Sequence, residues 1–185
     1  MNKKQLFESD RITLTEHPEK LEVIISGKIP GKQFNLLSVW LFSWTAAGIF
    51  VLTQVFSPMP DNQRIFMVVW LGFWLYFEYK IGTAWVWRKY GHEQVILTKD
   101  KLLLRFEVPV GRRASEFETA NIETVMNLEE QKGLFVKNYY SSFWVKGGET
   151  IGFNYNGRLY SFGRQLSVAD SKTLIAKINH KLNRR

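Results

Sequence analysis

Two long apolar runs stand out from a chain whose remaining parts alternate between polar and apolar positions. The runs extend from Phe34 to Phe56 and from Ile65 to Trp87, 23 residues each, and the first contains no charged residue. At 1.5 Å per residue such a helix is about 34 Å long, enough for a hydrocarbon core of about 30 Å. The segment between them holds two prolines and ends both helices. The pattern predicts a hairpin of two antiparallel transmembrane helices.

The second apolar run differs from the first because it carries two charged residues, Glu78 and Lys80. Counting inward from the turn places Glu78 at the depth of Ser43, with Trp44 and Thr45 beside it. We therefore expect one of these three residues to donate a hydrogen bond to Glu78. A carboxylate in a membrane can serve as a proton or ion site. The alternative is a carboxylate near the inner interface that is solvated or paired with Lys80 or Arg88.

Short alternating segments predict antiparallel β-structure on both sides of the hairpin. Before it, apolar positions alternate around the His-Pro-Glu-Lys turn and indicate a β-hairpin within residues 1–33. After it, Asn156-Gly157 favours a tight hairpin turn, and Ser167 begins an amphipathic helix at 168–182. The strands expected after the second helix are 94–98, 102–108, 114–119, 122–126, 134–137, 142–146 and 150–155, followed by the partner strand after Asn156-Gly157.

Residues 1–33 and 88–185 are expected to form one β domain interrupted by the transmembrane segment at 34–87, because both parts should lie on the same side of the membrane. Basic residues decide that side. Lys28 and Lys32 precede the first helix and Arg88 and Lys89 follow the second, whereas the turn has only Arg64 as a basic residue. The protein is predicted to be integral to the cell (inner) membrane, with both termini in the cytoplasm.

The segment GHEQVILTKDKLLLRFEV, followed by a basic turn, IETV, a late strand pair and a C-terminal helix, resembles the bacterial pleckstrin-homology-like (PH-like) membrane proteins. The resemblance implies an α+β membrane protein with a bent antiparallel β-sheet or split barrel, capped by the last helix, that binds or scaffolds a partner. Lys99, Lys101 and Arg105 occupy a stretch broadly similar to the one that binds phosphoinositides in eukaryotic relatives. No phosphoinositide motif is matched residue by residue.

The composition favours an anionic neighbour and gives no indication of catalysis. The net charge is +8 and there is no cysteine. For a domain tethered to a membrane, the anionic inner leaflet is a closer partner than nucleic acid, so no nucleic-acid binding is predicted. The histidines His17, His92 and His180 are not at metal-ligand spacing, and no nucleophile elbow or phosphate loop occurs. We expect no enzymatic activity, no metal and no cofactor.

Two clusters remain as candidate binding surfaces. Arg112 and Arg113 follow a glycine and could hold a lipid phosphate or an acidic loop, or could form a solvated turn. Tyr139 and Tyr140 could anchor a partner surface. The first hypothesis is a non-catalytic membrane-anchored adaptor or scaffold that binds a protein or anionic lipid headgroups at the inner leaflet. The alternative is an oligomeric transport or pore element that uses Glu78, which requires a homo-oligomer.

Overall fold

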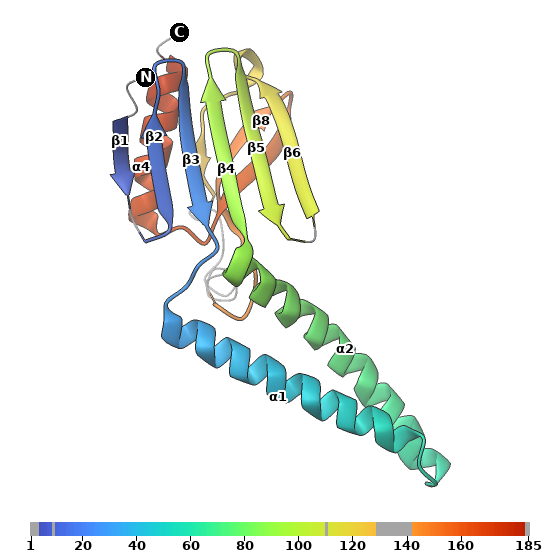
Figure 1. The fold of residues 1–185 in the computed structure, drawn as a ribbon. Helices are drawn as coiled ribbons and strands as arrows, with labels where there is room; N and C mark the ends of the chain where they lie inside the picture. Colours follow the sequence, from blue (N-terminus) through green and yellow to red (C-terminus); the bar gives the residue numbers. More distant parts are fainter. Residues whose placement is uncertain (1–3, 9, 110, 129–141, 184–185) are drawn as a thin grey trace.

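The computed structural model describes residues 4–8, 10–109, 111–128 and 142–183. They form an α+β structure with two antiparallel sheets, a C-terminal helix packed against them, and two long helices that project from one end of the sheets (Figure 1). The end from which the long helices project is called the helix-proximal end below, and the opposite end of the strands is the distal end.

The larger sheet is a six-stranded antiparallel meander with the order β1-β2-β3-β4-β5-β6. Its strands are β1 (Lys4–Glu8), β2 (Ile12–Glu16), β3 (Lys20–Ser26), β4 (His92–Thr98), β5 (Lys101–Val108) and β6 (Gly111–Glu118). Apolar residues at alternate positions, such as Leu21, Val23 and Ile25, turn one face of this sheet toward the core. Strand β1 has no counterpart in the predicted elements.

The two long helices are inserted between neighbouring strands of this sheet. They are α1 (Gly31–Val55) and α2 (Asp61–Tyr90), and they connect β3 to β4. Those strands pair in register from Lys20 opposite Thr98 to Ser26 opposite His92. The strands before and after the helices therefore belong to one sheet, and both helices leave the same end of it (Figure 1).

The smaller sheet has the order β7-β8-β9, with β7 at Met126–Asn127, β8 at Glu149–Tyr155 and β9 at Arg158–Arg164. Its hairpin turns at Asn156 (φ 50°) and Gly157 (φ 74°), which confirms the predicted turn with two positive φ angles. The last helix, α4, extends from Val168 to Asn183 and buries Leu174 and Ile178 in the core between the sheets. The predicted C-terminal helix is confirmed.

Two expected strands are wrong. Residues 142–146 form turns and bends, because Phe143 and Trp144 pack against the long helices and not into a sheet. The segment 122–126 holds only an isolated bridge from Ile122 to Tyr155 before β7, and it follows a short 3-10 helix, η1, at Thr119–Asn121. The expected strand at 134–137 lies outside the described residues.

Neither sheet closes on itself within the part of the chain that the structure describes. Strand β6 lies at one end of the larger sheet, opposite β1, and β9 lies at one end of the smaller sheet, opposite β7, so β6 and β9 each have one edge without a partner strand. The expected α+β architecture, with antiparallel sheets and a C-terminal helix packed on them, agrees with the structure, but the expected split barrel is not confirmed because no sheet of the described residues is closed. The unpaired edges of β6 and β9 lie on either side of the cleft described below.

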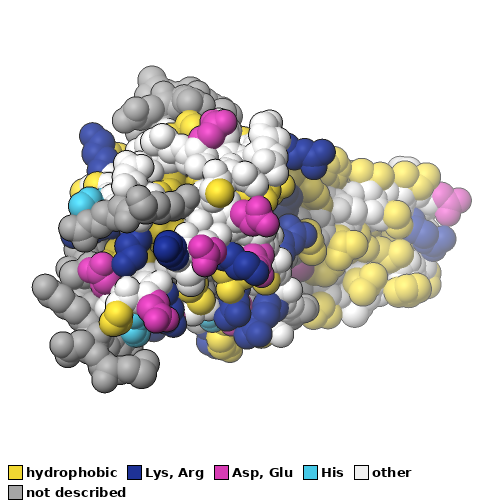
Figure 2. All heavy atoms as spheres, turned by 90° about the horizontal axis from the view of Figure 1, so that it is seen from above, with side chains coloured by type: hydrophobic (Ala, Val, Ile, Leu, Met, Phe, Trp, Pro, Cys, Tyr) yellow, Lys and Arg dark blue, Asp and Glu magenta, His cyan; other side chains and the backbone are white. Residues whose placement is uncertain are grey.

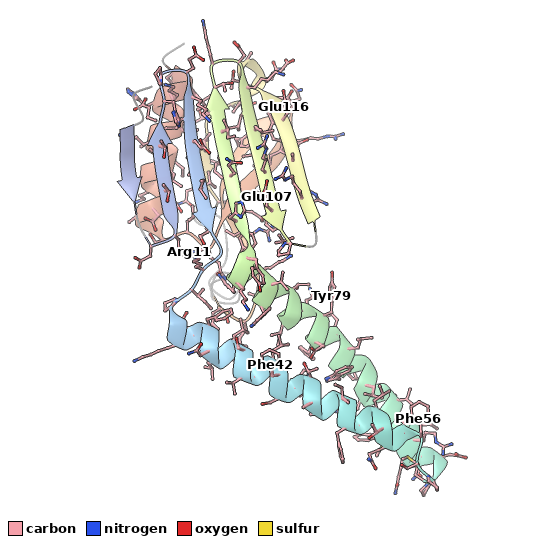
Figure 3. The ribbon with its side chains drawn as sticks, viewed as in Figure 1. Arg11, Phe42, Phe56, Tyr79, Glu107 and Glu116 are labelled. Atoms are coloured by element: carbon pink, nitrogen blue, oxygen red, sulfur yellow. The ribbon has the colours of Figure 1, made fainter. Side chains whose placement is uncertain are left out.

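Helices α1 and α2 are long and apolar enough to cross a membrane. They contact each other where Gly48 leaves room for the ring of Trp74, whose Nε1 donates to the backbone oxygen of Trp44 at 3.0 Å. Their outer faces are covered by exposed apolar side chains, among them Phe42 and Phe56 (Figure 3). Figure 2 shows the same contrast, with a largely hydrophobic surface on the projecting helices and mixed charges on the domain.

Candidate functional site

A cleft of about 750 Å³ separates the unpaired edges of β6 and β9. At the distal end the two strands approach each other, and the rings of Phe117 and Tyr160 meet with their centroids 4.6 Å apart. Its helix-proximal end is lined by a row across the larger sheet, in which Glu93 pairs with Phe106 and Phe106 pairs with Arg113. The volume lies within the range of about 300–1,000 Å³ typical of ligand sites.

The lining of this cleft carries three basic side chains, Arg113, Lys146 and Arg164, and two carboxylates, Glu93 and Glu149. Arg105 and Arg112 also border it, but their positions alternate with Phe106 and Arg113, so their side chains point to the other face of the larger sheet. Arg164 is compensated because it forms ion pairs with both carboxylates. Its guanidinium also lies 4.8 Å from the centre of the Phe106 ring. These contacts hold the floor of the cleft in a fixed arrangement in which the Arg164 charge is fully paired, and Arg113 and Lys146 add positive charge beside it.

Arg113 and Lys146 supply the uncompensated charge of the cleft. Among the described residues, no carboxylate lies within ion-pair distance of either side chain. Burial lowers the pKa of the Lys146 ammonium, and repulsion from Arg164 lowers it further. An anion bound beside the Lys146 ammonium would offset its repulsion from Arg164, so the site favours a negatively charged ligand.

Glu93 is the most deeply buried carboxylate of the cleft, with 5% of its surface exposed. The backbone N–H of Gly163 donates to its Oε2 at 2.5 Å, and the N–H of Arg164 donates to Oε1 at 3.3 Å. Burial raises the pKa of this carboxyl, although these hydrogen bonds and the Arg164 charge act in the opposite direction. Glu93 joins β4 to the end of β9 and so holds the two sheets together at the base of the cleft.

The structure places the predicted basic residues in different parts of the domain. Arg112 lies in the cleft lining but is paired with Glu107, with Nε 2.7 Å from the carboxylate oxygen. Arg105 contributes to the lining, and its guanidinium lies 3.4 Å from Gln94. Lys99 and Lys101 lie at the distal end, where Lys101 pairs with Glu116, some 20 Å along the strands from the helices.

Figure 3 shows the separation of these two regions: Glu107 lies on the lower half of the sheet and Glu116 on its upper half. Lys99 and Lys101 therefore do not join Arg112 and Arg113 in one site. Tyr139 and Tyr140 lie outside the described residues. Lys146 and Arg164, which complete the cleft, were not among the predicted site residues, because only the tertiary packing of β9 against β4 brings them there.

A buried joint connects the cleft to the long helices. Arg88, in the last turn of α2, is 2% exposed and donates to the backbone oxygens of Gly27 at 3.4 Å and Val145 at 3.0 Å, and to the side chain of Gln165. Trp87 is fully buried and stacks on Phe106 with centroids 4.7 Å apart. The sequence had indicated Arg88 as part of the basic flank of the second helix, and in the structure its side chain is buried in this joint.

The hydrogen bond expected at Glu78 is present. Thr45 Oγ1 donates to Glu78 Oε1 at 2.7 Å, whereas Ser43 is exposed on the other face of α1. Glu78 Oε2 is buried, and no described residue forms a hydrogen bond with it. Lys80 is exposed, and its ammonium lies 5.6 Å from the centre of the Tyr76 ring. Lys80 and Glu78 therefore do not form the ion pair considered as an alternative.

The described residues contain no group of histidines and carboxylates arranged to hold a metal ion. What the cleft offers is a positively charged, partly aromatic surface with fixed walls, which can bind an anion. Comparison with protein-family models, with curated proteins and with solved structures gives no match for this chain.

Proposed function

We propose that this protein is a membrane-anchored, non-catalytic adaptor of PH-like type, integral to the inner membrane with both termini cytoplasmic, whose cleft between β6 and β9 binds an anionic lipid headgroup. The observation that carries the proposal is the pair of uncompensated charges, Arg113 and Lys146, at the helix-proximal end of that cleft. A headgroup held there would fix the orientation of the domain at the membrane surface and leave its outer faces free for a protein partner.

The exposure of the long helices supports the membrane anchor. Phe56 is 82% exposed and Phe66 is 70% exposed, and apolar side chains of this size follow both helices along their lengths. A helix that belonged to the core of a soluble protein would bury such residues. In a bilayer these side chains would face lipid, and the helix lengths suit the hydrocarbon thickness.

The position of the cleft suits a ligand that comes from the bilayer. Strand β4 begins two residues after the end of α2, so Glu93, Phe106 and Arg113 lie close to the point where the helices leave the domain. In Figure 1 the helices slant beneath the lower ends of β5 and β6. If the helices cross the bilayer, the wide end of the cleft faces the anionic headgroup region, and its closed end points away from it.

Removing the two uncompensated charges tests the proposal. The full-length protein is incorporated into nanodiscs that contain equal amounts of phosphatidylglycerol and phosphatidylcholine, and the lipids retained after extraction are counted by native mass spectrometry. Each basic group near an anionic surface contributes about 1 kcal/mol. Arg113→Gln with Lys146→Gln should therefore weaken phosphatidylglycerol retention roughly thirtyfold, which corresponds to about 2 kcal/mol.

The control removes the same charge from another surface. Lys172 and Lys177 are exposed on α4, and the variant with both changed to Gln should retain phosphatidylglycerol as the unaltered protein does. Equal losses in the two variants would show that net charge alone attracts the lipid, and the cleft proposal would then be wrong. Unchanged retention in the cleft variant would reject it as well.

A second candidate function is an oligomeric transport or pore element that uses Glu78. The buried, unpartnered Oε2 of Glu78 favours it, because a carboxylate without a partner can accept a proton or an ion. Two helices cannot enclose a pathway, so this function requires several copies of the chain. It predicts that Glu78→Gln abolishes a proton or ion flux in liposomes, and an unchanged flux would exclude it.

A further inference from the structure

A second hollow, which we call the aromatic notch, lies where the domain meets the long helices. It has a volume of about 350 Å³ and is lined by Trp40 and Trp44 of α1, Phe77 and Ile81 of α2, and Trp144. Ile81 is nine residues before the end of α2, which places the notch about 14 Å along the helix from the domain. In a bilayer this depth is on the domain side of the hydrocarbon core.

The notch is a shaped aromatic surface. The Trp40 and Trp44 rings stack with centroids 5.3 Å apart, and the Trp144 ring meets Trp40 edge-on at 5.4 Å. All five lining side chains are apolar or aromatic, and the indole Nε1 of Trp44 is buried away from solvent. The indole N–H groups of the three tryptophans are the only polar groups of these five side chains, so the notch suits a mainly apolar occupant.

One short segment joins the notch to the basic cleft. Trp144 lines the notch and Lys146 lines the cleft, and these two residues are separated by at most about 7 Å of chain. The segment is held in place from both sides: Gln165 Nε2 donates to the oxygen of Ser142 at 2.9 Å, and Arg88 donates to the oxygen of Val145. A ligand with an anionic head and an apolar tail could therefore contact both surfaces at once.

We propose that a single anionic phospholipid occupies both sites, with its phosphate beside Lys146 and Arg113 and one acyl chain in the aromatic notch against Trp144. This inference builds on the proposed headgroup function and adds to it the part of the protein that takes the acyl chain. A transmembrane helix of a partner fits less well, because a helix with its side chains is about 10–12 Å wide, whereas the notch is a small local hollow.

A lipid that occupies both sites differs in one testable respect from a lipid that only contacts the outer faces of the helices. An acyl chain gains little hydrophobic free energy by moving from the bilayer to the notch, since both surroundings are apolar. The headgroup must therefore supply the preference for this position. The occupancy of the notch by a chain should depend on the charge of the head to which that chain is attached, and on Lys146.

Photocrosslinking with matched lipids tests this dependence. Phosphatidylglycerol and phosphatidylcholine with the same diazirine-bearing acyl chain are incorporated separately into nanodiscs with the full-length protein, and labelled residues are mapped by mass spectrometry. Phosphatidylglycerol should label the notch residues at least fivefold more than phosphatidylcholine does. Lys146→Gln should reduce the difference, and Trp144→Ala should abolish labelling at Trp40.

A matched aromatic variant serves as the control. Phe50 is 64% exposed on α1, ten residues farther from the domain than Trp40, and Phe50→Ala should leave the labelling of the notch unchanged. Equal labelling by the two lipids, or labels spread evenly over the exposed helix faces, would overturn the single-lipid inference. If phosphatidylglycerol retention still depended on Arg113 and Lys146, the headgroup function would stand without it. Loss of both dependences would reject both proposals.

Discussion

The joint between α2 and the larger sheet can be tested with one methyl group. Gly91 follows α2 with φ −73° and ψ 142°, a conformation that any residue adopts. A Cβ atom at this position would lie 2.6 Å from Cδ2 and from Cζ3 of Trp87, and closer still to a third ring atom. Because Trp87 is fully buried and stacked on Phe106, the ring cannot move away without losing that contact.

The expected change in the free energy of unfolding combines one stabilising and two destabilising contributions. A glycine replaced by alanine in a compatible conformation usually gains about 0.4–1 kcal/mol, because the unfolded chain loses freedom. Against this, crowding of a packed core costs about 1–3 kcal/mol, and loss of an aromatic stack costs about 0.5–1.5 kcal/mol. We therefore expect Gly91→Ala to lower the free energy of unfolding by about 2 kcal/mol, the opposite sign from an unconstrained glycine.

The assay compares the free energy of unfolding of full-length variants in one detergent, followed by near-ultraviolet circular dichroism. Gly82 is the matched control, since it lies in α2 and a Cβ there meets no atom within 4 Å. Gly82→Ala should gain up to about 1 kcal/mol. In a Trp87→Leu background, Gly91→Ala should cost almost nothing, because its steric partner has been removed.

Two results would contradict this expectation: Gly91→Ala could stabilise the protein as Gly82→Ala does, or its cost could persist in the Trp87→Leu background. Either result would mean that Trp87 does not occupy the space beside Gly91. The description of α2 as rigidly joined to the cleft floor would then be wrong as well.

Three further changes probe the domain by the same unfolding measurement. Gly157→Ala should cost about 1–2 kcal/mol, because φ is 74° and nothing crowds the position, so the cost is that of the left-handed conformation alone. Arg88→Ala should cost about 2–4 kcal/mol by leaving two backbone oxygens without donors, and Arg88→Lys should recover only part of it. Burial raises the pKa of Glu93 above its ordinary 4.5, so its contribution to stability decreases as pH rises from about 4.5 through the raised value, and Glu93→Gln should remove that decrease.

Each of these has an outcome that contradicts it. An unchanged stability of Gly157→Ala would mean that the turn does not require a positive φ. Equal stabilities of the Arg88→Ala and Arg88→Lys variants would deny the role of the charged donor at the joint. A difference between the unaltered protein and Glu93→Gln that stayed constant from pH 4 to pH 8 would show that Glu93 titrates alike in the folded and unfolded states.

The sequence predicts the parts of this protein that local pattern controls. Length and apolar composition identify the long helices, and Asn156-Gly157 is identified because its two residues readily adopt the positive φ angles that a tight hairpin turn needs. The contact of Thr45 with Glu78 follows from counting helix positions on either side of a short turn. In each case, residues that are close in the sequence, or that are brought together by one short turn, determine the structure.

Where the pattern fails, distant packing decides. The alternation at 142–146 resembles a strand, but its aromatic residues Phe143 and Trp144 find partners on α1 and α2. Arg88 has the position of a basic residue flanking a membrane helix, yet the backbone oxygens of Gly27 and Val145 draw it into the interior. The sequence alone identifies neither the helices that Phe143 and Trp144 contact nor the backbone oxygens that Arg88 binds.

The cleft was predictable only in part. The run Gly111-Arg112-Arg113 indicated the two arginines as candidate binding residues, and both border the cleft. Lys146 and Arg164 come from segments more than thirty residues away in the chain, and they reach the cleft because β9 packs against the end of β4 through Glu93. The sequence pattern contains no signal for that contact.

The proposed function requires a lipid phosphate in the cleft against Arg113. Solid-state NMR can detect it as dipolar coupling between lipid ³¹P and arginine side-chain ¹⁵N, on the full-length protein in phosphatidylglycerol bilayers. We expect Arg113→Gln to remove a distinct part of the coupling, whereas Arg158→Gln, which changes an exposed residue at the distal end of β9, should remove none. Identical coupling in the unaltered protein and Arg113→Gln would show that no lipid phosphate lies beside Arg113.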